Sequence, residues 1–95
     1  MEKKRKDIIV TVIGRDQVGI VARIATALAE SNINIIDMNQ KILGGDIFAM
    51  TLLADRAGSG LSMPEITSRL QGSVRDLPLK VTVQDSEVFQ YMHRV

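Results

Sequence analysis

The order in which two hydrophobic periods alternate along this chain constrains its fold more than any other feature. Residues 8–13 (IIVTVI) are a short, β-branched, nearly uniform apolar run that stops at Gly14, which is typical of a buried central strand. The apolar residues that follow recur at helical spacing, namely Val21, Ile24, Ala25 and Leu28. The pattern predicts a strand followed by an amphipathic helix that ends near Ser31 and Asn32.

Two further strands and a tight turn are predicted next. Residues 34–42 alternate with a period of two, so that one face is apolar and the other polar. The apolar face carries Ile36, Met38 and Ile42, and the polar face carries Asp37, Asn39 and Lys41. Two adjacent glycines, Gly44 and Gly45, mark a hairpin because glycine readily adopts positive φ angles. The returning strand places on one face Phe48, Met50, Leu52 and Ala54.

A second helix and a fourth strand complete the pattern after a loop at residues 55–60. Ser62 followed three residues later by Glu65 predicts a capping box, and Pro64 is tolerated in a first helical turn. Pro78 ends this helix. The buried stripe of the helix is Ile66, Leu70 and Val74, and the apolar face of the last strand is Leu79, Val81 and Val83.

The element order is therefore βαββαβ, in which two strand–helix–strand units interlock through right-handed crossovers. This order predicts an α+β, ferredoxin-like sandwich: a four-stranded antiparallel sheet with two helices on one face. We expect residues 1–95 to form one domain, with a basic, flexible tail at residues 1–6. A C-terminal extension at residues 86–95 is expected to pack on the domain or across a dimer. Its apolar residues have helical spacing, namely Val88, Phe89, Met92 and Val95.

Composition excludes several functions that this fold can carry. The net charge of +1 gives no reason to expect nucleic acid, and we interpret the basic run at residues 3–6 as a solvated tail rather than a binding patch. An RNA-recognition sheet needs aromatic platforms, but aromatic residues make up only 3% of the chain, and the central strands hold only Phe48. With no cysteine and His93 as the single histidine, we expect neither a metal site nor a cofactor.

The cellular location of the protein is also constrained by the sequence. No apolar run approaches the roughly 20 residues of a membrane helix. The N-terminus has basic residues without the apolar region of a signal peptide. The absence of cysteine fits a reducing compartment. We therefore expect a cytoplasmic protein without a membrane partner.

The turn at residues 14–20 (GRDQVGI), between the first strand and the first helix, is the one chemical feature that remains. Free backbone N–H groups and the helix dipole favour anions at such a place, including the carboxylate of an amino acid. Asp16 could bind an α-ammonium group, or it could cap the helix. Gly19 could admit a ligand close to the backbone, or it could only permit close packing. We interpret Arg23 as a solvated helix residue, and no nucleophile–base pair is present, so catalysis is not expected.

These residues resemble a known family. Residues 14–20 resemble the first-loop signature of ACT domains, in which an aspartate or asparagine stands two residues before Pro-Gly; Val18 here replaces the proline. Residues 31–35 (SNINI) are similar to the helix-to-strand passage of that family. The likeness covers residues 7–85, and residues 89–95 (FQYMHRV) resemble the ending of the free-standing UPF0237 group.

The resemblance implies a ligand site shared between two subunits. ACT domains usually pair side by side, and amino acids bind between the first loop of one subunit and the second strand of the other. Carried over by position, the loop residues are Asp16, Val18, Gly19 and Ile20, and the strand residues are Asn34 at its start with Met38 and Asn39 further along. Asn34 could instead be a turn residue that caps the preceding loop.

Two hypotheses for function follow. The first is a homodimeric regulatory sensor that binds a small molecule, an amino acid by resemblance, and acts on a separate protein partner. The second is a constitutive interaction module whose seam stays empty and whose sheet edge and C-terminal extension hold a partner. Both use the second strand, whose unpaired N–H and C=O groups at the sheet edge invite pairing with a symmetry mate.

Overall fold

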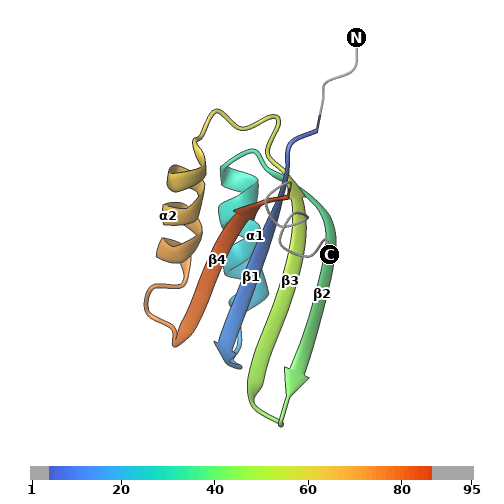
Figure 1. Cartoon of the computed structure of the whole chain (residues 1–95). Helices are drawn as coiled ribbons and strands as arrows, with labels where there is room; N and C mark the ends of the chain where they lie inside the picture. The colour runs from blue at the N-terminus through green and yellow to red at the C-terminus, as the bar shows by residue number, and fades with distance from the viewer. Residues whose placement is uncertain (1–4, 87–95) are drawn as a thin grey trace.

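The computed structural model describes residues 5–86, and they adopt the predicted βαββαβ order. The elements are β1 (Asp7–Arg15), α1 (Ile20–Glu30), β2 (Asn34–Leu43), β3 (Ile47–Asp55), α2 (Met63–Ser73) and β4 (Leu79–Asp85). All strand pairs are antiparallel and the sheet order is β2-β3-β1-β4. In Figure 1, α1 runs behind β1 and α2 lies beside β4. The predicted ferredoxin-like sandwich is confirmed.

The core lies between the sheet and the helices, where the predicted alternation places it. Ile8, Val10 and Val12 of β1 are fully buried. Their register partners on β3 are Ala54, Leu52 and Met50, and each of these is at most 1% exposed. The helices complete the core with Ile20, Ile24, Leu28, Ile66 and Leu70. Burial of this one sheet face fixes the register, because a slip by one residue would turn every core side chain outward.

The strand β2 lies at the edge of the sheet, as predicted, but its alternation is interrupted. Ile35 pairs with Ala54 and Asp37 pairs with Leu53, so a β-bulge places Ile36 between them. The extra residue has no register partner on β3, so the predicted period of two is interrupted at Ile36. Met38 keeps the predicted side, since it pairs with the buried Leu52.

The end of α1 and the start of α2 follow the predicted signals, whereas α2 ends at Ser73, well before Pro78. At the end of α1, Asn32 adopts a left-handed conformation with φ 59°, and the N–H of Ile33 donates to the Leu28 carbonyl at 3.0 Å. At the start of α2, the Glu65 N–H donates to Ser62 Oγ at 3.3 Å, and the Ser62 N–H donates to Glu65 Oε1 at 2.8 Å. This last bond lowers the pKa of the Glu65 carboxyl. The predicted capping box is confirmed.

The segment before β1 is attached to the domain from Lys6 onward. The Lys6 N–H donates to Asp55 Oδ1, and the Lys6 carbonyl accepts from the Arg56 N–H, both at 2.9 Å. The predicted basic tail therefore makes contact at its last residue. Of the predicted C-terminal extension, only Ser86 is among the described residues, so its packing stays a prediction.

Gly14 permits a close backbone approach between β1 and the start of β4. A Cβ atom at this position would overlap the Pro78 carbonyl oxygen and stand 2.8 Å from Leu79 Cα. Neither backbone group can rotate away. The same strand junction carries the bond from the Arg15 N–H to the Pro78 carbonyl, at 3.3 Å.

We therefore expect Gly14→Ala to lower the free energy of unfolding by about 1–3 kcal/mol, the usual effect of overpacking. Urea denaturation would measure it. Gly60→Ala is the matched control, since a Cβ at Gly60 meets no described atom within 4 Å. Equal stability of the two variants would contradict the role assigned to Gly14.

Candidate functional site

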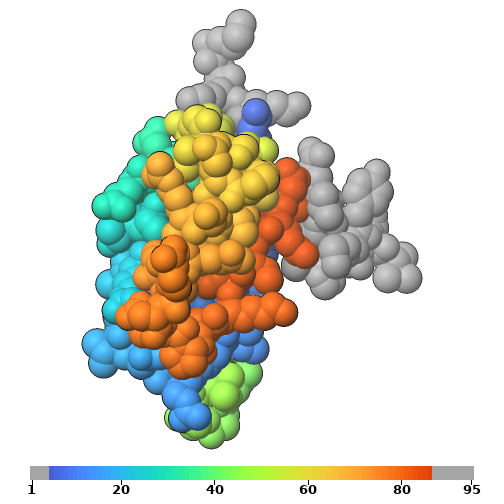
Figure 2. Space-filling model, turned by 90° about the vertical axis from the view of Figure 1, so that its left-hand side faces the viewer, coloured from blue at the N-terminus to red at the C-terminus, as the bar shows by residue number. Residues whose placement is uncertain are grey.

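The loop between β1 and α1 is attached to the β2–β3 hairpin. The Asp16 N–H donates to the Asp46 carbonyl at 2.8 Å, and Asp46 lies in the turn that Gly44 and Gly45 form with φ angles of 59° and 90°. The turn confirms the predicted hairpin. Figure 2 shows this hairpin projecting beyond the two helices at one end of the molecule. The loop and the hairpin turn thus form one end of the sheet.

The first turn of α1 has no side-chain cap. Gly19 is its N-cap residue, and its carbonyl accepts from the Arg23 N–H at 3.0 Å. The alternative in which Asp16 caps the helix is therefore wrong. The N–H groups of the first turn are left for solvent or a ligand, at the positive end of the helix dipole.

Gly19 has a conformational role rather than a packing role. Its φ of 95° lies in the left-handed region that favours glycine, and it is the residue at which the loop turns into α1. A Cβ built on it would meet nothing within 4 Å among the described residues, so the close-packing alternative is wrong. The open space beside Gly19 leaves the backbone accessible.

The side chains of the loop point in different directions. Asp16 is exposed, and its carboxylate makes no hydrogen bond or ion pair within residues 5–86. Val18 is 99% exposed, whereas Ile20 is 2% exposed and belongs to the core. Ile20 can therefore contribute only its backbone N–H to a ligand, and Asp16 offers the one charged group of the predicted set.

Asn34 lies at the opposite end of the sheet from the loop. It pairs with Asp55, whereas Leu43, at the other end of β2, pairs with Ile47 next to the hairpin turn. Nine residue steps along a strand separate the two ends by about 30 Å. Within one subunit, the structure therefore does not bring Asn34 together with Asp16.

The turn role that was the alternative for Asn34 is filled by Asn32 instead. Asn32 adopts the left-handed conformation, and its side-chain amide donates to the Gly58 carbonyl at 2.7 Å. Asn34 is an exposed strand residue, and its side chain makes no hydrogen bond within the described part of the chain. Its amide thus remains available.

Met38 and Asn39 lie midway along β2 on opposite faces. Met38 pairs with Leu52 and is on the helix side, whereas Asn39 pairs with Thr51 on the face without helices. Asn39 also lines a shallow groove of about 510 Å³ between β2 and β3. The sequence analysis assigned no function to the other residues of this groove, although the predicted polar face of β2 already pointed to Asp37 and Lys41. The other lining residues are Asp37, Lys41, Leu43, Ala49, Thr51 and Leu53.

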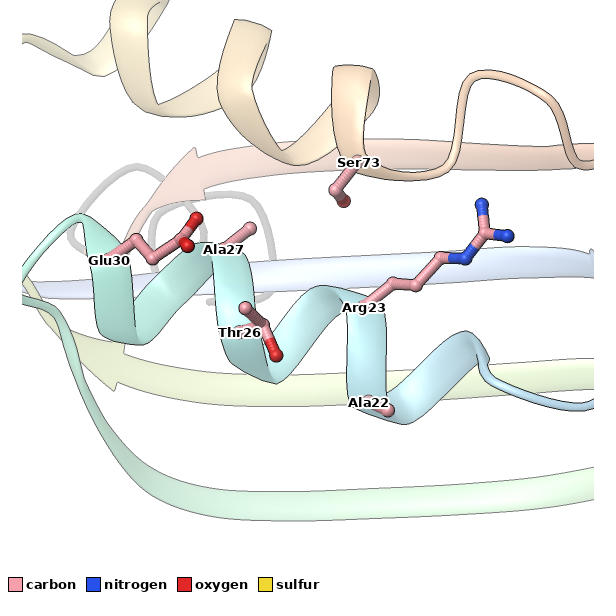
Figure 3. Close-up of a pocket in the computed structure, with 6 residues that line it drawn as sticks. All are labelled: Ala22, Arg23, Thr26, Ala27, Glu30 and Ser73. Carbon is pink, nitrogen blue, oxygen red and sulfur yellow. The ribbon is translucent and has the colours of Figure 1, made fainter.

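A second groove, of about 430 Å³, lies between the two helices (Figure 3). Arg23 extends along it toward the chain that follows α2, where it donates to Asp76 Oδ1 at 2.5 Å. This hydrogen bond lowers the pKa of the Asp76 carboxyl. Arg23 is thus an exposed, paired helix residue. The rest of the lining offers one charged group, Glu30, beside small side chains, namely Ala22, Thr26, Ala27 and Ser73.

Two further features of the described residues bear on function. Residues 5–86 contain no cluster of three or more histidine, cysteine, aspartate or glutamate side chains that could hold a metal ion. No helix in this part of the chain is long and apolar enough to cross a membrane. The candidate site comprises the loop at residues 16–19 and the β2 edge.

The fold is shared with proteins of known structure. An ACT domain protein from Streptococcus pneumoniae superposes with a TM-score of 0.78 at 25% identity, over 92% of this chain and 97% of that one. A putative glycine cleavage system transcriptional repressor is similar in fold, with a TM-score of 0.71 at 20% identity over 84% of this chain and 45% of that one.

Sequence comparison agrees with this likeness. The family model of the ACT domain matches residues 8–71. A UPF0237 protein of Methanosarcina acetivorans is 41% identical over 87 residues, which are 92% of this chain and 94% of the relative. A UPF0237 protein of Methanopyrus kandleri is 44% identical, over 92% and 96% of the two chains. The resemblance seen in the first loop is thereby confirmed, and the chain belongs to the ACT domain family, within its UPF0237 group.

Proposed function

We propose that this protein is a cytoplasmic, non-catalytic regulator that binds an amino acid between two copies of itself and acts on a separate protein. ACT domains are a regulatory family whose members generally bind small molecules such as amino acids and often dimerise. The observation that carries the proposal is the placement of Asp16 and Asn34 at opposite ends of one subunit.

A twofold axis at the β2 edge would bring Asp16 of one subunit close to Asn34 of the other. If β2 pairs with its own mate, the two strands run antiparallel. The start of the second β2 then lies beside the Leu43 end of the first. That end of the sheet also carries the loop at residues 16–19, which is bound to the hairpin turn through Asp46. The partner's Asn34 would thus approach Asp16.

Exposed apolar side chains on β2 support the same pairing. Met38 is 43% exposed and Ile42 is 47% exposed, although both lie on the helix side of the sheet. In Figure 1, β2 is the outermost strand and extends beyond α1 toward the hairpin. Pairing along this edge would remove these side chains from water and satisfy the free backbone groups.

The loop offers groups that match each charge of an amino acid. The ligand carboxylate would accept hydrogen bonds from N–H groups in the first turn of α1, beside the positive-φ residue Gly19. The α-ammonium group would bind the Asp16 carboxylate. The partner's Asn34 can both donate and accept, so it can bind either end.

A constitutive interaction module is the second candidate. It is favoured by the apolar character of the exposed edge and by Val18, which is 99% exposed in the loop. A valine leaves this loop less rigid than the proline common in the family, which weakens pre-organisation for a ligand. In that case the edge and the loop would contact protein and no amino acid would bind.

A thermal-unfolding panel of the twenty amino acids separates the two candidates. A ligand at about 100 times its Kd stabilises the folded state by about 2.7 kcal/mol. For a domain of this size each kcal/mol raises Tm by about 4–8 °C. We expect a clear rise in Tm with one or a few amino acids. A flat panel on well-folded protein would contradict the sensor and favour the interaction module.

The shift should depend on the two proposed ligand residues. Asp16→Asn keeps the backbone bond to Asp46 but removes the charge, and Asn34→Ala removes the amide; each should abolish most of the rise in Tm. Glu30→Gln is the control, since it removes an exposed carboxylate at the far end of α1. If the ligand raised Tm as much in both variants as in the native protein, neither Asp16 nor Asn34 would belong to the site.

A mixing experiment tests whether the two residues act from different subunits. Refolding the Asp16→Asn and Asn34→Ala proteins together forms mixed dimers in which one seam keeps both native residues. We expect titration calorimetry to recover ligand binding in the mixture, with native affinity and reduced stoichiometry. If both residues served one site within a single subunit, no binding would return.

A further inference from the structure

The sheet face opposite the helices, here called the open face, carries opposite charges at its two ends. The strand register places three carboxylates where β1 begins and three cationic side chains at the hairpin end. These residues are Asp7, Asp37 and Asp55 at the first end, and Arg15, Lys41 and Lys80 at the second. Because the two signs are separated along the strands, the open face is complementary in charge to an inverted copy of itself.

Between the charged ends, two apolar pairs flank a central row that is polar but uncharged. Ile9 pairs with Leu53 on one side of this row, and Ile13 pairs with Ala49 on the other. Ile13 is 44% exposed. In sheet order from β4 to β2, the central row is Thr82, Thr11, Thr51 and Asn39. An antiparallel sheet face that meets water is usually polar, so the apolar pairs favour a face that is covered by another surface.

Two of the charges on the open face have no opposite charge beside them. Asp37 and Lys41 are both exposed on β2, and neither makes an ion pair within residues 5–86. They lie four residues apart on one strand, about 13 Å, which is too far for them to pair with each other. The Met38 N–H donates to Asp37 Oδ1 at 2.9 Å, but this bond leaves the charge uncompensated. Both groups can therefore pair with charges on another molecule.

We propose that two copies of this chain stack open face against open face, around a twofold axis that runs across the strands at the central row. Each strand then lies over its own mate and runs in the opposite direction. Lys41 of one copy faces Asp37 of the other, and Ile13 faces Ile9. Asp7 is already paired with Arg5 at 2.6 Å, and Arg15 of the other copy extends this pair.

The open face is large enough for such a contact. Four strands are about 19 Å wide, and the nine residues of β1 are about 27–30 Å long. Two faces of this size cover about 1,000 Å² in total, which is the lower limit for a specific interface. Packed sheets cross at about 30°, and the long side chain of Lys41 can span the resulting offset.

Stacking uses the face of the sheet and leaves the β2 edge free. The inference therefore does not rest on the proposed amino-acid site or on pairing at that edge. Stacking alone gives a dimer, whereas stacking together with edge pairing gives four chains in two layers. In either case, loss of the stacked contact halves the mass of the assembly.

Charge reversal tests which residues face each other. Lys41→Glu places two carboxylates together at each end of the stack, so analytical ultracentrifugation should show a shift toward half the native mass. Adding Asp37→Lys to the same chain should restore the native mass, because the exchanged charges again face opposite charges. Arg69→Glu is the control, since it makes the same charge change on the exposed side of α2. A native protein that stays monomeric, or a double variant without recovery, would overturn the proposal.

Cross-linking tests the stacked face without changing its charge, since the chain has no cysteine of its own. In the stack, Thr11→Cys lies over its own mate, at about the 10 Å that separates packed sheets. A bismaleimide reagent of that span should therefore join two chains in high yield. Thr26→Cys, on the exposed side of α1, should give almost no covalent dimer. Equal yields from the two variants, or no covalent dimer from Thr11→Cys, would overturn the proposal.

Discussion

Burial of one face of the central strand β1 is the constraint on which the rest of this structure depends. Ile8, Val10 and Val12 are fully buried between the sheet and the helices, and β1 pairs in register with β3 on one side and β4 on the other. Because β1 and β3 are antiparallel, β1 ends at Arg15 beside Ile47, where β3 begins. The loop that follows therefore opens at the same end of the sheet as the β2–β3 hairpin, where a backbone hydrogen bond joins the two.

The candidate site follows from this arrangement and from a helix that begins without a cap. The start of α2 is satisfied by its own side chains, through Ser62 and Glu65, whereas α1 begins at a glycine with positive φ and offers its N–H groups outward. The strand that carries Asn34 ends near the loop but begins far from it. One subunit thus holds the two proposed halves of the site at opposite ends of the sheet, and the proposed pairing at the β2 edge would bring them together across two subunits.

Local signals in the sequence were sufficient for most of the fold. The end of α1, the capping box of α2 and the glycine hairpin each depend on neighbouring residues, so their chemistry is readable along the chain. The bulge at Ile36 was not predicted, because a bulge arises from pairing with β3 and leaves no local signature. The tie from Asp16 to Asp46 joins backbone groups of any residue type, so composition could not reveal it. Asp16 and Gly19 were singled out by the chemistry of the turn before α1, and Val18, Ile20 and Asn34 were added by the family resemblance. The distance between Asp16 and Asn34 required the sheet order.

The bulge at Ile36 has a consequence for how far β2 can extend a sheet. A bulged strand bends and twists away from a flat edge, so regular pairing of β2 with the proposed second copy would be confined to the stretch from Asp37 to Leu43. A short edge of this kind favours a closed pair over an open-ended stack of chains, and it resists the strand-by-strand growth that leads to fibres. Asn34, before the bulge, would then lie beyond such a paired stretch, and its side chain makes no hydrogen bond within the described residues.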